Sequence, residues 1–130
     1  MFSYIFMKIL ENRPAHYDIG IHILSGGHAN RIRRQIVQTY VRPGMEILDI
    51  GCGTGSLIID AVKAGANATG IDISKGMIAI AKKRIANNEL TDRITLQHAG
   101  VVEVDSLFEE NSFDLIISTL VFSELYAEER

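Results

Sequence analysis

The sequence of 130 residues contains one cysteine, Cys52, and lacks any long apolar run. A single cysteine excludes a disulfide within the chain and favours a reducing compartment. No apolar run approaches the roughly 18 residues that a membrane-spanning helix requires, so we expect no membrane contact. The apolar segment Met1–Leu10 lacks the basic start and cleavage site of a signal peptide, and we interpret it as a short amphipathic helix. These absences predict a cytoplasmic protein.

The chain also has little excess charge of either sign, since its formal net charge is −3 at pH 7. This balance gives no electrostatic reason to expect a nucleic-acid partner. Arg31, Arg33 and Arg34 form a local basic cluster, but on a helix their side chains point in different directions. We interpret them as a solvated helix surface rather than a phosphate-binding patch.

From about residue 30 onward, the pattern alternates between helix and strand. Apolar spacing and turn residues predict helices over 31–40, over 56–64 and after an N-cap at Ser74. Short apolar runs predict strands over 45–50, 68–73, 94–98 and 113–118. Because helices connect the strands, the sheet should be parallel. The fold class is therefore α/β, a Rossmann-like doubly wound sheet.

The chain ends soon after the fourth predicted strand, whereas a doubly wound domain usually continues with further strands. We therefore expect a sheet truncated after that strand, with an N-terminal helical segment over 1–30 and half of a Rossmann-like domain over 31–130. Without a neighbour, the apolar strand 113–118 would be an exposed edge. We expect a homodimer that buries this edge together with residues 120–125.

The most informative motif is Asp49-Ile50-Gly51-Cys52-Gly53-Thr54-Gly55, whose glycine loop over 51–55 joins the first strand of the alternating pattern to its helix. Glycines let a ligand approach the backbone closely, and the helix N-terminus offers unpaired N–H groups. Open α/β sheets bind ligands at the carboxyl ends of their strands, where this loop lies. A phosphate or a carboxylate would suit such a loop equally well.

The spacing and the flanking acids favour one kind of ligand. Ser56 stands where a dinucleotide fingerprint has its third glycine, and no Gly-Lys-Ser/Thr of a P-loop follows. Asp49 would suit the ammonium group of an amino-acid ligand. Asp72, at the end of the next strand, can accept hydrogen bonds from ribose hydroxyls. A ligand with an amino-acid end and a nucleoside end satisfies both acids, and S-adenosylmethionine has both.

Three segments resemble the motifs of class I S-adenosylmethionine-dependent methyltransferases. Glu46–Gly55 resembles their first motif, Gly70–Ser74 their second and Ser112–Ile116 their fourth-strand motif. The resemblance implies methyl transfer from S-adenosylmethionine to an acceptor, a small molecule or a protein, that the sequence does not identify. Tyr17-Asp18 and Ser118–Leu125 resemble a narrower group, the corrinoid-protein-associated methyltransferases.

The resemblance also assigns binding roles. The methionine part of the cofactor would contact the first-motif residues Asp49, Gly51 and Gly53, and Gly55 would also belong to the cofactor site. Asp72 would take the ribose, and Ile73 would lie against the adenine. Where the family commonly has an acid for the adenine amine, this chain has Gly100-Val101, so we expect a backbone contact at Val101. Ser118 would lie near the reactive methyl group, and Tyr17 would close over the cofactor or pack against a helix.

Several other residues have structural interpretations. Cys52 is small enough to be a spacer between glycines, Asp114 lies away from the ligand edge, and His98 suits a hydrogen-bonded strand end. We expect no metal site, since His16, His22 and His28 would scatter on a helix. No residue is identified as catalytic. The alternative to an enzyme is a noncatalytic module that binds S-adenosylmethionine or S-adenosylhomocysteine and acts with a partner protein.

Overall fold

The computed structural model describes residues 5–11 and 29–121. Within these ranges, no helix is long and apolar enough to cross a membrane. The elements are β1 (Ile5–Glu11), α1 (Ala29–Tyr40), β2 (Glu46–Ile50), α2 (Ser56–Lys63), β3 (Asn67–Asp72), α3 (Lys75–Asn87), β4 (Ile94–His98), a 3₁₀ turn η2 (Val101–Glu103), α4 (Val104–Leu107) and β5 (Leu115–Val121).

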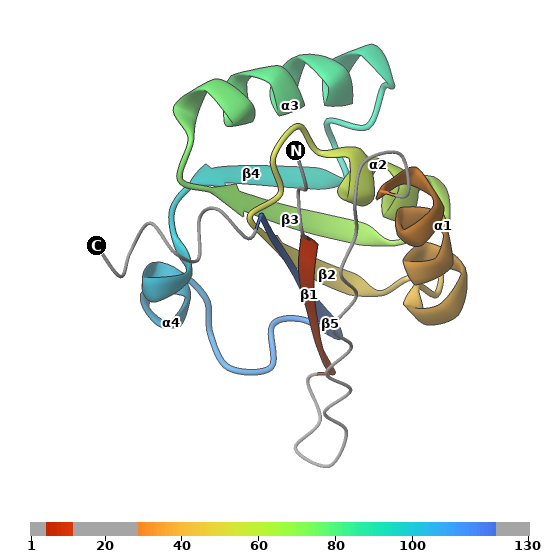
Figure 1. The fold of residues 1–130 in the computed structure, drawn as a ribbon, viewed down its shortest axis with the longest axis horizontal. Helices are drawn as coiled ribbons and strands as arrows, with labels where there is room; N and C mark the ends of the chain where they lie inside the picture. The colour runs from red at the N-terminus through yellow and green to blue at the C-terminus, as the bar shows by residue number, and fades with distance from the viewer. Residues whose placement is uncertain (1–4, 12–28, 122–130) are drawn as a thin grey trace.

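The strands form one five-stranded sheet in the order β1-β5-β2-β3-β4 (Figure 1). β2 pairs in parallel with β3 and with β5, and β3 pairs in parallel with β4. These four parallel strands alternate with helices, which confirms the predicted α/β Rossmann-like class. β2 lies in the interior of the sheet, so the loop that follows it leaves from the middle of the carboxyl edge.

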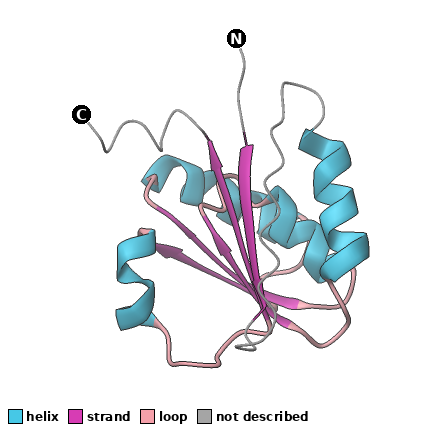
Figure 2. Ribbon diagram, turned by 60° about the horizontal axis from the view of Figure 1, so that its bottom comes forward, coloured by secondary structure: helices cyan, strands magenta, loops and turns pink. Residues whose placement is uncertain are grey.

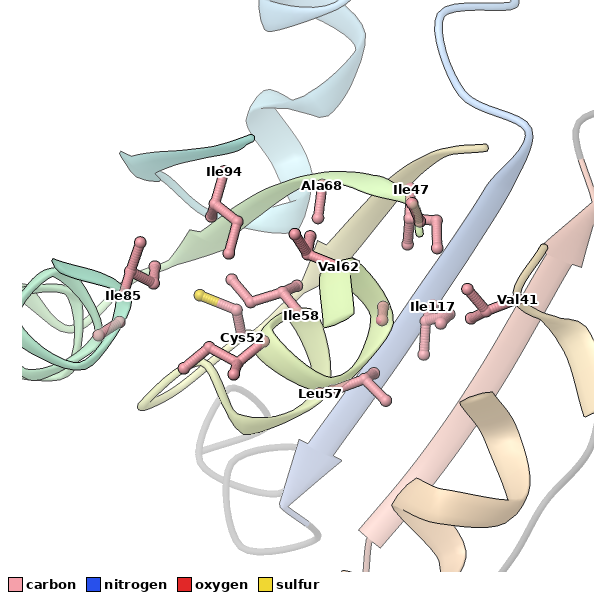
Figure 3. Close-up of a cluster of buried hydrophobic side chains, with 14 of the residues drawn as sticks. Val41, Ile47, Cys52, Leu57, Ile58, Val62, Ala68, Ile85, Ile94 and Ile117 are labelled. Carbon is pink, nitrogen blue, oxygen red and sulfur yellow. The ribbon is translucent and has the colours of Figure 1, made fainter. Parts of the chain in front are cut away.

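The helices divide unequally between the two faces of the sheet (Figure 2). Side chains from α1, α2 and α3 pack against the sheet in the larger hydrophobic cluster, where Ile47, Ile58, Val62 and Ile117 are fully buried (Figure 3). The smaller cluster on the other face contains Leu48, Ile50 and Ile71, with Val104 of α4 against it. Because strand side chains alternate between faces, Asp49 shares the face of Ile47.

The structure corrects the prediction for the N-terminal segment. Residues Ile5–Glu11 form strand β1, not part of a helix, and β1 pairs antiparallel with β5 along its full length, from Ile5 opposite Val121 to Glu11 opposite Leu115. A short apolar run is compatible with either conformation, and here pairing with a strand distant in sequence decides it. The strand predicted at 113–118 is consequently not an edge. The homodimer therefore stays a prediction, but an exposed edge at this strand no longer supports it. The domain boundary near residue 30 also stays a prediction.

Local sequence signals set the ends of the helices. Ser74 is the N-cap of α3, as predicted, and its Oγ accepts a hydrogen bond from the Met77 N–H at 3.2 Å.

The basic cluster of α1 lies on the helix surface. Arg33 forms an ion pair with Asp60 of α2 at 2.7 Å, whereas Arg31 and Arg34 are exposed. The predicted basic cluster is thus a helix surface that also ties α1 to α2.

Candidate cofactor-binding site

The glycine loop turns sharply at the carboxyl end of β2. Gly51, Gly53 and Gly55 have φ angles of 76°, 56° and 83°, in the left-handed region that favours glycine. The N–H groups of Gly51 and Cys52 both donate to the carbonyl oxygen of Ile71, at 2.8 and 2.9 Å. Apart from Gly53 and its two neighbours, no heavy atom in the described part of the chain lies within 4 Å of where a Cβ on Gly53 would be, so the backbone here faces open space among these residues. A ligand can therefore approach the main chain closely at Gly53.

Asp49 is a buried acid with an unused oxygen. Only 1% of its surface is exposed, and its Oδ1 has no hydrogen-bond partner among residues 5–11 and 29–121. Burial raises the pKa of Asp49 to about 8, and the negative charge of Asp72 adds to the rise. A buried polar atom without a partner is costly. A cationic donor such as an ammonium group would satisfy it and stabilise the ionised carboxylate.

Asp72 connects β3 to the glycine loop. Its Oδ2 accepts a hydrogen bond from the Gly53 N–H at 2.8 Å, and its Oδ1 accepts one from the Ser74 N–H at 2.8 Å. A carboxylate has about four acceptor positions, so each oxygen of Asp72 retains capacity for a hydroxyl donor. The side chain is half-buried, which leaves it accessible from the carboxyl edge of the sheet.

The residue that follows Asp72 presents an apolar side chain at the same edge. Ile73 is 66% exposed, and its carbonyl oxygen lies 2.8 Å from Nε2 of His98, which confirms His98 as a hydrogen-bonded strand end. A Cβ on Gly100 would lie 3.1 Å from Cγ2 of Ile73, so the chain after β4 passes close to Ile73. Val101 begins the 3₁₀ turn directly after Gly100. An exposed isoleucine at this position is an apolar contact for a flat ring.

Ser118 of β5 lies opposite Ile50 of β2, one residue before the glycine loop, and is half-buried. The structure thus brings Ser118 to the same edge as Asp49, Asp72 and the loop glycines. Tyr17 lies outside the described residues. The binding roles of all these residues stay predictions.

Two residues have the structural roles expected of them. Cys52 is buried, and burial together with the nearby Asp49 raises its thiol pKa to about 12, so it is a neutral thiol rather than a nucleophile at neutral pH. Oδ2 of Asp114 accepts a hydrogen bond from the Glu46 N–H at 2.8 Å, at the amino end of β2 and away from the loop. Among the described residues, no three His, Cys, Asp or Glu side chains gather as metal ligands.

Arg84 of α3 also reaches the glycine loop, and its position there was not predicted from the sequence. Its Nη1 lies 2.8 Å from the carbonyl oxygen of Thr54, 3.0 Å from Thr54 Oγ1 and 2.8 Å from Ser56 Oγ. A basic residue near a helix C-terminus is common on a surface, so the sequence gives no signal that this one reaches the glycine loop.

These features fit S-adenosylmethionine. The cofactor offers an ammonium group for Asp49, ribose hydroxyls for Asp72 and an adenine ring for the exposed side chain of Ile73. Gly53 connects the two acids. Its N–H is hydrogen-bonded to Asp72, and its loop follows strand β2, which carries Asp49. The open space beside Gly53 is therefore close to both acids in the fold.

Comparisons with known proteins support this choice of cofactor. A family model described as a methyltransferase domain matches residues 47–130. A demethylmenaquinone methyltransferase of Symbiobacterium thermophilum is 38% identical over 114 residues, which are 85% of this chain and 43% of that protein. A ribosomal protein L11 methyltransferase of Dictyoglomus thermophilum is 32% identical over 106 residues, 80% of this chain and 33% of that protein.

The fold is also found among solved structures. The YcgJ protein of Bacillus subtilis superposes with a TM-score of 0.58 at 21% identity, over 65% of this chain and 36% of that one. The chain belongs to the class I S-adenosylmethionine-dependent methyltransferases, which confirms the resemblance of its three motifs. It spans less than half the length of the two curated relatives. The narrower resemblance to the corrinoid-protein-associated group stays a prediction.

Proposed function

We propose that the protein transfers a methyl group from S-adenosylmethionine to an acceptor, and that the edge formed by the glycine loop and Asp72 holds the cofactor. The observation that carries the proposal is the buried Oδ1 of Asp49, which no described residue hydrogen-bonds and which lies in β2, two residues before the loop that contains Gly53. Family membership supports the same cofactor. The enzymes among the curated relatives favour catalysis over a noncatalytic module.

The chemistry asks the protein mainly to position two reactants. The cofactor supplies a methyl group already activated on a sulfonium sulfur, which a nucleophile displaces in line. Asp49 would orient the amino-acid end, Asp72 the ribose and Ile73 the adenine, so that the methyl group projects toward the acceptor. Ser118, which lies opposite Ile50 at the end of β2, is the residue that we propose to lie near the methyl group. A general base is required only if the acceptor loses a proton on attack.

The two curated relatives are named for different acceptors, so they support the same kind of methyl donor but no one acceptor. One is named for demethylmenaquinone and the other for ribosomal protein L11. For location, we propose the cytoplasm, since the single cysteine of the chain is a buried free thiol that suits a reducing compartment.

Calorimetric titration of the chain with S-adenosylmethionine, S-adenosylhomocysteine and NAD tests the cofactor. We expect both sulfur-containing nucleosides to bind and NAD to bind more weakly than either, because a pyrophosphate would face two acids. NAD binding more tightly than both would refute the proposal. Transfer of a labelled methyl group to quinone and protein acceptors then distinguishes an enzyme from a binding module.

A further inference from the structure

Helix α3 contacts the glycine loop, although the loop joins β2 to α2 and α3 belongs to the next β-α unit. Arg84 lies in the last turn of α3, and its half-buried side chain reaches back to Thr54 and Ser56. A single nitrogen, Nη1, is within hydrogen-bond distance of three oxygens, one of them a main-chain carbonyl. A charged donor makes stronger hydrogen bonds than a neutral one. This contact therefore restrains the backbone of the loop as well as its side chains.

The same helix face also approaches the loop through an alanine. A Cβ on Gly55 would lie 3.4 Å from the Cβ of Ala81, three residues before Arg84. Residues three apart on a helix share a face, so Ala81 and Arg84 meet the loop together. Gly55 is the N-cap of α2 and has no side chain of its own to make a capping hydrogen bond. Arg84 thus restrains Thr54 and Ser56, the two neighbours of Gly55, which has no side chain to hold its own conformation.

Two anchors of opposite charge hold the loop. Asp72 accepts the N–H of Gly53 at 2.8 Å, and Arg84 donates to the C=O of Thr54 at 2.8 Å. The peptide unit between Gly53 and Thr54 lies between these anchors, beside the open space at Gly53. Fixing both sides before a ligand arrives reduces the ordering cost of binding.

We propose that Arg84 is a positioning residue for cofactor binding, which holds the glycine loop in its binding conformation through Thr54 and Ser56. Arg84 does not itself touch the cofactor in this scheme. The inference rests on the proposed function, because it concerns the affinity for the methyl donor and its product.

Arg93 provides a matched control. Its Nη2 donates to the carbonyl oxygen of Ala66 at 2.8 Å, and its Nε donates to Oδ1 of Asn67 at 3.3 Å. It therefore also ties a loop through one carbonyl and one side chain. Asn67 begins β3, so this contact lies at the amino edge of the sheet, opposite the cofactor edge.

The test compares Arg84→Met, Arg84→Lys and Arg93→Met by titration with S-adenosylhomocysteine, at a temperature where each variant is fully folded. Arg84→Met should raise Kd by about tenfold, because the charged hydrogen bonds to the loop are lost. Arg84→Lys keeps a charged donor and should recover part of the affinity. Arg93→Met should lower Tm and leave Kd within about twofold, since its contacts are remote from the site.

A purely structural arginine would lower Tm without changing Kd in the folded chain. Arg84 is therefore not a positioning residue if Arg84→Met binds like the wild type, or if Arg93→Met loses as much affinity. If Arg84→Met does not fold, Arg84→Lys decides, since a positioning role requires its Kd to exceed that of the wild type by about threefold. A wild-type chain that binds no S-adenosylhomocysteine overturns the proposed function as well, whereas normal wild-type binding with unaffected variants overturns only the role of Arg84.

Discussion

Asp72 accepts a hydrogen bond from the backbone N–H of Gly53 at 2.8 Å, so the acid at the end of β3 is bonded directly to the glycine loop that follows β2. The two motifs that the sequence places apart are therefore one unit in the structure. Asp72 has two tasks in this unit, to fix the loop and to receive the ribose with its remaining lone pairs. Changing it should affect both.

Asp72→Ala should weaken binding of S-adenosylhomocysteine by about 2–3 kcal/mol, because it removes charge-assisted hydrogen bonds to the ligand and to the loop. Asp114→Ala is the matched control, since Asp114 also accepts a backbone N–H at 2.8 Å but at the amino end of β2. Calorimetry on folded variants should find the affinity of Asp114→Ala nearly unchanged. Equal losses at the two positions would mean that the ligand edge is misplaced.

The buried acid Asp49 should make cofactor binding depend on pH. Its pKa is raised to about 8, so below that pH an ammonium ligand must displace the proton before it pairs with the carboxylate. The affinity for S-adenosylhomocysteine should therefore increase as pH rises toward 8, by up to about tenfold per pH unit. Titrations at several pH values measure the slope, and Asp49→Asn should remove it. Parallel profiles for the wild type and Asp49→Asn would contradict this role for Asp49.

The same acid should make stability depend on pH in the opposite sense. Because the pKa of Asp49 is raised from 3.8 to about 8, the folded chain binds its proton more tightly than the unfolded chain. This contribution to stability is fully present below 3.8 and is lost as pH rises through about 8. In the absence of ligand, the Tm of the wild type should fall over this range relative to that of Asp49→Asn. A constant difference in Tm across the range would show that Asp49 does not titrate there.

The sequence predicted the parallel part of the fold well, because each of its elements carries a local signal. The N-cap at Ser74 and the strand over 94–98 agree with the structure, and the glycine loop follows β2 as predicted. β1 was predicted wrongly because a short apolar run with one lysine is ambiguous until its pairing partner is known, and β5 lies more than a hundred residues later. Arg84 was missed for the same reason, since its three contacts join residues about thirty positions apart. Local patterns identify motifs, whereas contacts distant in sequence decide how the motifs are held.

Gly70 of β3 lies where the returning glycine loop leaves no room for a side chain. A Cβ on Gly70 would lie 2.9 Å from Sγ of Cys52 and 3.0 Å from Cδ1 of Ile58, both of which are buried. Gly70→Ala should therefore destabilise the chain by about 1–3 kcal/mol, as overpacking does. In contrast, a Cβ on Gly76 in α3 would meet just the Oγ of Ser74, at 3.7 Å, among the described side chains, so Gly76→Ala should stabilise the chain by about 0.4–1 kcal/mol.

Urea unfolding of both variants and of the double mutant Gly70→Ala/Cys52→Ala measures these effects. Removing Sγ relieves the closest contact, so the double mutant should lose less stability than the two single changes together. Recovery should be partial, because Cβ of Cys52 would still lie 3.0 Å from the new methyl group. If Gly70→Ala unfolds at the same urea concentration as Gly76→Ala, the loop does not pack against β3 as the structure has it. The residual strain in Gly70→Ala would also displace Cys52 between Gly51 and Gly53, so its affinity for S-adenosylhomocysteine should fall as well.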